Sequence, residues 1–155
     1  MTHFSFETEY NLSIETQFVL PVQYDLLAVF LFALTGSLIA VKRGFDPVGV
    51  SIITIISGAG GGIIRDAIFL NIEPAAIRDW RYSAVLFAAI VAVLLARSLL
   101  QTRPIALLIM ATEAVGIGIN SVYGTQRALD AKTSVYAAII VGLINAIGGR
   151  LMRDV

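Results

Sequence analysis

The sequence predicts an all-α integral membrane protein built on an inverted-topology repeat of three-helix units. Three observations lead to this fold class. The chain of 155 residues is 57% hydrophobic and only 14% charged, with a mean hydropathy of +0.84, which is far more apolar than a soluble domain. Its apolar segments are long enough to cross a bilayer. A glycine-rich motif within the second segment returns at the end of the chain.

Five membrane-spanning helices are expected, because a helix needs about 20 mainly apolar residues to cross the hydrocarbon layer. Their expected ranges are 18–41, 48–72, 83–100, 105–123 and 134–155, joined by short polar links. Trp80 and Tyr82 precede the third span, where aromatic rings commonly anchor a helix at the membrane interface. Pro47 and Pro104 stand at expected first helical positions, where proline costs no hydrogen bond.

Composition also excludes several classes of protein. The formal net charge is zero, so nothing indicates a nucleic-acid partner or a polybasic membrane-surface protein. There are no cysteines for disulfides or thiolate metal sites. His3 is the only histidine, and no nucleophile, phosphate-binding or metal-ligand motif is present, so we expect neither an enzyme nor a cofactor. Residues 1–17 lack the basic start of a signal peptide and are interpreted as an N-terminal tail.

Orientation is predicted from the charges in the links, with the N-terminus outside. Lysines and arginines are evenly divided between the two sides, so only the acidic residues supply an asymmetry, and acids weigh little in this rule. On the expected inner side lie Lys42, Arg43, Arg97 and Arg103, with Asp46. On the outer side lie Arg78, Arg81, Arg127 and Lys132, interleaved with Glu73, Asp79 and Asp130.

An internal repeat is visible in the motif itself. The stretch NAIGGRLMRDV (145–155) resembles SGAGGGIIRDA (57–67), and Arg65 matches Arg153, 88 positions later. The same ungapped offset pairs Asp66 with Asp154, Gly60 with Gly148, Gly61 with Gly149, Gly36 with Gly124, Ala40 with Ala128, and Asp25 with Glu113. We therefore infer a first three-span repeat at 18–112 and an incomplete second repeat at 113–155. An odd number of spans inverts the second copy.

The glycines of the motif predict a bend and a polar cavity. Each interior glycine costs a helix about 1 kcal/mol relative to alanine, so a run of them favours a break near residues 58–62. Backbone groups freed by a break are tolerated only beside protein or a water-filled cavity, which indicates a pore or binding site. The alternative is close helix–helix packing. The glycines concerned are Gly58, Gly60, Gly61 and Gly62, with Gly148 and Gly149 in the fifth span.

The charges after the glycines are candidates for a functional or gating site. Adjacent residues on an α-helix point about 100° apart, so we expect Arg65 and Asp66 not to neutralise each other directly. Intramembrane charges are usually paired and functional. The alternative is an ordinary charged pair at the headgroup level. The expected partners are Arg153 and Asp154 from the other repeat, or Asp25 and Glu113.

Glu113 stands in the middle of the fourth span with no basic residue within nine positions. The alternative to a functional role is a protonated glutamate that is hydrogen-bonded to a neighbouring helix. Asp25, its repeat partner, is expected nearer the interface. Four further polar residues are expected to line a cavity, although each alone is more often a helix–helix hydrogen bond: Asn120, Ser121, Thr125 and Asn145.

Several stretches together carry a family resemblance. They are DLLAVFLFALTGSLIAVKRGFDPVGV (25–50), ISGAGGGIIRD (56–66), IRDWRY (77–82), EAVGIGINSVYGTQRAL (113–129) and the closing GGRLMRD (148–154). Over residues 24–155 the chain resembles the bacterial membrane family that includes TRIC-type (trimeric intracellular cation) channels, whose domain is also described as a glycine transporter domain. The resemblance implies two inverted three-helix repeats plus a seventh helix, glycine-kinked second and fifth helices lining a pore in each subunit, and a homotrimer. The motif positions it implies are Gly60, Gly61, Gly62, Arg65 and Asp66, then Gly148, Gly149, Arg153 and Asp154.

The chain departs from the family pattern in two residues and in length. Arg150 replaces the third glycine of the second motif, and Glu113 replaces the usual aspartate that opens the fourth span. The sequence stops as the second motif ends, so we expect either a natural short form or a shortened chain without spans six and seven. The expected function is a monovalent-cation channel of the potassium type in the inner membrane. The alternatives are a carrier for glycine or a similar small zwitterion, and a non-conducting fragment or assembly partner.

Overall fold

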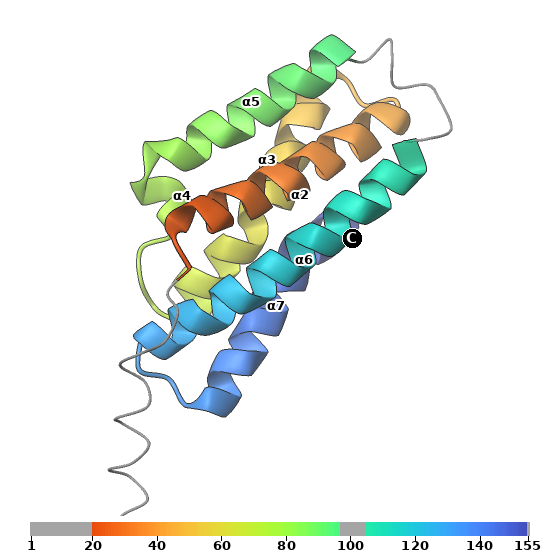
Figure 1. The fold of residues 1–155 in the computed structure, drawn as a ribbon. Coiled ribbons are helices and arrows are strands. Elements are labelled where there is room, and N and C mark those ends of the chain that lie inside the picture. Colours follow the sequence, from red (N-terminus) through yellow and green to blue (C-terminus); the bar gives the residue numbers. More distant parts are fainter. Residues whose placement is uncertain (1–19, 97–104, 155) are drawn as a thin grey trace, which may run out of the picture.

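The computed structural model describes residues 20–96 and 105–154, and this part of the chain is helical without strands. The helices are α2 (Val22–Lys42), α3 (Pro47–Ile63), the π-helix η1 (Ile64–Phe69), α4 (Ala75–Arg78), α5 (Trp80–Ala96), α6 (Ile105–Asp130) and α7 (Val135–Asp154) (Figure 1). The expected N-terminal tail with His3, the end of the expected third span, and the link with Arg97, Arg103 and Pro104 lie outside the described residues.

The helices confirm the all-α class and change the limits of the expected spans. Three helical segments are long and apolar enough to cross a membrane, namely Val22–Lys42, Pro47–Phe69 and Val135–Asp154, and Trp80–Ala96 is a shorter apolar helix. Helix α6 continues to Asp130, so the polar stretch after Tyr123 that was expected as a link is largely helical. Tyr82 is only 3% exposed, so its predicted role as an interfacial anchor is wrong.

The start of α3 follows from local chemistry. Gly44 adopts a φ of +78° in the turn after α2, a conformation that glycine tolerates best. Asp46 is the N-cap, and its side chain accepts a hydrogen bond from Gly49 N at 2.8 Å. Pro47 is the first helical residue, which confirms that prediction. The turn and cap therefore fix where α3 begins.

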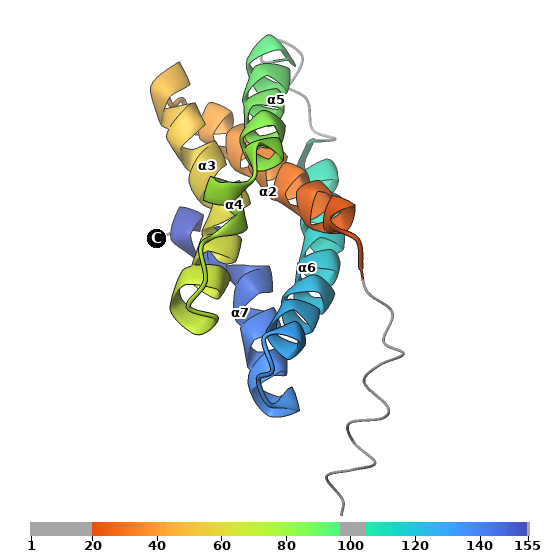
Figure 2. The same cartoon turned by 90° about the vertical axis from the view of Figure 1, so that its left-hand side faces the viewer.

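Four helices form a ring. Helix α2 packs on α3, α3 on α7, α7 on α6 and α6 on α2, while α5 packs on the outside of α2 and α3 (Figure 2). Helices α2 and α6 run in opposite directions (Figure 1), and Leu20 N, just before α2, donates to Gln126 Oε1 near the end of α6 at 2.9 Å. Helices 88 positions apart thus occupy corresponding places in the ring, as an inverted duplication requires. The duplication itself stays a prediction.

Candidate functional site

Helices α3 and α7 cross at the two glycine motifs, too closely for side chains. A Cβ at Gly61 would collide with the backbone carbonyl of Asn145, and a Cβ at Gly149 would collide with that of Ser57. Ser57 and Asn145 are 88 positions apart, as are the two glycines. The offset of 88 positions in the proposed repeat therefore relates the two close contacts to each other.

The neighbouring glycines extend this pattern. A Cβ at Gly60 would lie 2.9 Å from the sulfur of Met152, and a Cβ at Gly148 would lie 3.2 Å from Gly61 Cα and 3.5 Å from the side chain of Ile64. Met152 and Ile64 are again 88 positions apart. Close packing, the alternative interpretation of the motif, therefore accounts for both glycine pairs.

The remaining motif glycines differ from each other. Gly58 faces α2 and α5, where a Cβ would lie 2.7 Å from Leu86 and 3.0 Å from Ala33. At Gly62 the nearest atom would be Nη2 of Arg65, 3.8 Å away. The α-helix continues through all four glycines and becomes a π-helix only at Ile64. The helix is therefore not interrupted within residues 58–62, and a bend of its axis there stays a prediction.

Arg65 and Asp66 are buried side by side at the start of the π-helix. Arg65 is 1% exposed and Asp66 is fully buried. Nε of Arg65 lies 2.7 Å from Oδ1 of Asp66, and Nη2 lies 3.1 Å from Oδ2. The prediction that these neighbours do not pair was wrong. Arg153 pairs with Asp154 in the same way within an α-helix, so the length of the arginine side chain makes the pairing possible, not the wider π turn.

Arg65 also contacts three other helices. Its Nη1 lies 3.6 Å from Oδ1 of Asp25 on α2 and 3.5 Å from Oδ1 of Asn145 on α7. Its guanidinium lies 5.3 Å from the ring centroid of Tyr123 on α6, within the range of a cation–π contact. Of the expected partners, Asp25 is present, whereas Arg153 and Asp154 belong to a separate cluster. We name the set Asp25, Arg65 and Asp66 the first cluster.

Residues outside the motif complete the first cluster. Tyr82 on α5 donates its hydroxyl to Oδ2 of Asp25. The backbone N–H of Ala75, where α4 begins, donates to Oδ2 of Asp66 at 3.0 Å. Sequence reasoning missed the role of these residues and of Tyr123. Tyr82 is separated from Asp25 by 57 positions, and no local pattern in the sequence joins them.

The second cluster consists of Glu113, Arg150, Arg153 and Asp154. Arg153 Nη1 lies 2.9 Å from Oε1 of Glu113, and its Nε lies 2.9 Å from Oδ1 of Asp154. Arg150 lies 3.6 Å from Glu113 and 3.7 Å from Asp154, and its side chain is 47% exposed. Glu113 on α6 thus forms ion pairs with two arginines of the neighbouring helix α7.

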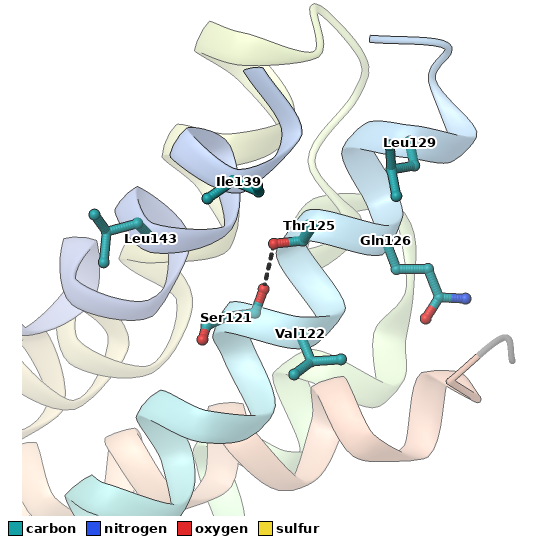
Figure 3. Close-up of a pocket in the computed structure, with 7 residues that line it drawn as sticks. All are labelled: Ser121, Val122, Thr125, Gln126, Leu129, Ile139 and Leu143. Carbon is teal, nitrogen blue, oxygen red and sulfur yellow. Dashed lines mark hydrogen bonds between the residues drawn. The ribbon is translucent and has the colours of Figure 1, made fainter. Parts of the chain in front are cut away.

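The polar residues of the fourth and fifth spans divide between two places. Asn145 donates from Nδ2 to the backbone carbonyl of Asn120 at 2.8 Å, and both lie against the first cluster, beside a cavity of about 10 Å³. Ser121 and Thr125 line a groove of about 640 Å³ between α6 and α7 instead (Figure 3). There Thr125 Oγ1 donates to the carbonyl of Ser121 at 2.8 Å.

Apolar helices packed around buried, paired charges define a multi-pass membrane protein of the helical-bundle class. The sequence also identifies its family. The chain belongs to the glycine transporter family, whose sequence model matches residues 23–98 and 110–155.

Curated relatives of this chain are bacterial membrane proteins. It is 31% identical to a UPF0126 membrane protein of Vibrio cholerae over 134 residues, which cover 84% of this chain and 54% of the relative. It is 27% identical to the UPF0126 inner membrane protein YadS of Escherichia coli over 132 residues, covering 84% of this chain and 63% of the relative. The chain thus spans a little over half the length of these relatives.

Solved structures of cation channels share the fold. The TRIC trimeric intracellular cation channel orthologue from Rhodobacter sphaeroides superposes with a TM-score of 0.78 at 25% identity, covering 86% of this chain and 68% of the channel. A prokaryotic TRIC channel crystallised in 0.5 M KCl gives a TM-score of 0.78 at 26% identity, covering 85% and 67%. Most of the described chain is therefore folded as in these channels.

Proposed function

We propose that this chain is the core of a monovalent-cation channel, of the potassium type, in the inner membrane. The observation that supports this most directly is the first cluster, which holds two aspartates and one arginine within the ring of α2, α3, α6 and α7. All three side chains are at most 4% exposed. Buried, paired charges within membrane helices commonly mark ion or substrate pathways. The shared fold with TRIC cation channels supports the same assignment.

In this proposal the conduction path passes between the four helices of the ring, and Arg65 closes it. The guanidinium contacts α2, α6 and α7, and the cavity beside it has room for about one water molecule. Opening then requires Arg65 to release Asp25 and Asn145, its two contacts longer than 3.4 Å, while it keeps the close pair with Asp66. The close crossing of α3 and α7 at their glycines is the rigid support for this movement. From the TRIC neighbours we also propose that the chain assembles as a homotrimer.

The alternative is a secondary carrier for glycine, and only the description of the family favours it. A broken helix suits a zwitterion because its amino end attracts carboxylates, but α3 is continuous through the glycine run. The cavity of about 10 Å³ beside Arg65 is also far smaller than a zwitterion with several non-hydrogen atoms.

Flux through purified protein in liposomes separates these functions. Potassium-dependent currents without saturable glycine uptake are the expected result. Saturable uptake of labelled glycine without unitary currents would replace the channel with the carrier. If neither occurs while a full-length relative conducts, this chain is a non-conducting fragment or assembly partner.

Orientation is also a proposal, with the N-terminus outside. The chain has no cysteine, so single replacements report the side of each link without background. Phe45→Cys in the link after α2 and Ala131→Cys in the link after α6 should react with an impermeant thiol reagent from opposite sides, with Ala131→Cys labelled from outside. Labelling of both positions from one side would overturn the assignment.

A further inference from the structure

The charges of the first cluster do not balance. Asp25 and Asp66 face a single arginine, and the exposures of the three residues are 3%, 0% and 1%. Arg65 directs Nε and Nη2 to Asp66, so only Nη1 faces Asp25, at 3.6 Å. Asp25 is left with the Tyr82 hydroxyl and this one distant contact. A buried carboxylate that lacks a full counter-charge is costly, so it either takes up a proton or has a second positive charge beside it.

A space for that charge lies next to Asp25. The cavity of about 10 Å³ is lined by Asp25, Gly62, Arg65, Asn120 and Asn145, among others. A volume of this size holds about one water molecule, and a bare alkali cation is of comparable size. Gly62, which has no side chain, is part of this lining.

An oxygen ligand without a partner stands at the same cavity. Asn120 is 4% exposed, and its Oδ1 has no hydrogen-bond partner among the described residues. Its backbone carbonyl is already engaged by Asn145, so the side-chain oxygen is a separate, free acceptor. Amide oxygens and carboxylates are the ligands that replace the hydration shell of alkali cations. A water molecule would satisfy Asn120, but it would leave the charge of Asp25 uncompensated.

The second cluster shows what such a charge does. The residue 88 positions after Gly62 is Arg150, and its guanidinium lies 3.6 Å from Glu113, the counterpart of Asp25. There two arginines face two acids. The second half carries its extra positive charge on a side chain, whereas the first half has a glycine and an empty space.

We propose that the first cluster binds one monovalent cation between the Asp25 carboxylate and the side-chain oxygen of Asn120, where it supplies the positive charge that Arg150 supplies in the second cluster. Repulsion from Arg65 is limited, because its charge is balanced by the two-point pair with Asp66. The proposal deepens the cation channel proposed above, since it assigns a discrete binding site on the path.

The test is cation-dependent stability, measured without flux. Thermal unfolding of the purified chain in detergent is followed in potassium chloride and in N-methylglucamine chloride at equal ionic strength. We expect the thermal midpoint to rise with the logarithm of the potassium concentration above Kd, and not with that of N-methylglucamine, since a ligand that binds only the folded state stabilises it by RT ln(1 + [L]/Kd). Equal stability in both salts would overturn the site and leave a bound water as the occupant of the cavity.

Two variants sharpen this test. Asn120→Ala removes one ligand and should raise the Kd for potassium, fitted from the dependence of the thermal midpoint on potassium concentration, by about tenfold or more. Gly62→Arg supplies the charge covalently, as in the second cluster, and its thermal midpoint should not respond to potassium. Asp79→Asn, in a charged pair outside both clusters, is the control and should keep the potassium response. A normal response in Asn120→Ala contradicts the site, even if Gly62→Arg does not fold.

Liposome flux separates this inference from the function on which it rests. Potassium stabilisation without conduction would keep the site and overturn the channel. Conduction with equal stability in both salts would keep the channel and overturn the site.

Discussion

The two halves of the ring carry the same motif in different surroundings. In the first half, α5 lies on α2 and α3, and its Tyr82 and Leu86 join an apolar core with Val29 and Ala33. Between α6 and α7 the described residues leave a groove of about 640 Å³ in its place (Figure 3). The aspartate of the first motif is 1% exposed in its side chain, and that of the second is 42% exposed.

This difference shows that the energy of a charged pair depends on the helices packed around it and not on its sequence motif alone. Both arginines pair with the following aspartate and with an acid 40 positions earlier in the chain. What differs is how far other helices cover the pair. Residues of α4 and α5 contact the carboxylates of the first cluster. The Asp154 side chain is 42% exposed. The two copies therefore serve as each other's controls.

The largest difference is expected between Asp66→Asn and Asp154→Asn. Removing one charge of a buried pair costs about 3–5 kcal/mol, whereas an exposed pair contributes about 0–1 kcal/mol. Asp66→Asn should thus sharply lower the thermal midpoint and the folded yield in detergent, measured by size-exclusion chromatography after heating. Equal losses in the two variants would show that the covering of the first cluster is unimportant.

Tyr82→Phe tests the contribution of α5 to the same cluster. The hydroxyl donates to the buried Asp25 carboxylate, and hydrogen bonds to charged groups contribute about 1.5–3 kcal/mol. A lower thermal midpoint is expected while the helical content stays the same. Tyr136→Phe is the matched control, because Tyr136 is 76% exposed and should tolerate the change. If the two variants have equal stability, Tyr82 does not hold Asp25.

Sequence alone predicted the helices better than the contacts. Apolar length indicated α2, α3 and α7 because a bilayer imposes that length, and Pro47 marked the start of α3 because proline suits a first helical position. The end of α6 was missed because Gln126 and Arg127 look like a polar link. Packing of α6 against α2 and α7 keeps that segment helical.

The sequence predicted which charged residues belong to the site but not which residues contact each other. The offset of 88 positions singled out Asp25, Arg65, Asp66 and their counterparts. The pairing of Arg65 with Asp66 was excluded from backbone direction alone, although an arginine side chain is long enough to fold back. Tyr82 was interpreted as an interfacial anchor and Tyr123 gave no signal, because their contacts with the cluster arise only from helix packing.

A smaller effect is expected from Gly61→Ala compared with Gly62→Ala. At Gly61 a methyl group meets the backbone carbonyl of Asn145, which cannot move without shifting α7, whereas at Gly62 the nearest atom is 3.8 Å away. Overpacking costs about 1–3 kcal/mol, and alanine returns about 1 kcal/mol in helix propensity. Gly61→Ala should therefore lower the thermal midpoint and Gly62→Ala should hold or raise it. Gly149→Ala should repeat the result of Gly61→Ala. A stable Gly61→Ala variant would favour the bend over the packing interpretation.

The smallest effect is expected at Asp79 and Arg81, a charged pair outside both clusters. Arg81 Nη2 lies 2.6 Å from Oδ2 of Asp79, with the side chains 46% and 23% exposed. Hydrogen bonds from Arg81 hold the pKa of the Asp79 carboxyl below its ordinary value of 3.8. A depressed pKa means that the pair stabilises the fold above pH 3.8 and that this contribution disappears as the pH falls through the lower, folded-state pKa. Asp79→Asn should accordingly match the parent chain closely from pH 5 to 8, with any small difference reduced by added salt and absent at the acid end. Thermal midpoints across pH in low and high sodium chloride measure this. A large, salt-independent loss at neutral pH would show that Asp79 is as strongly coupled to the fold as Asp66, and that exposure does not separate the pairs of this protein.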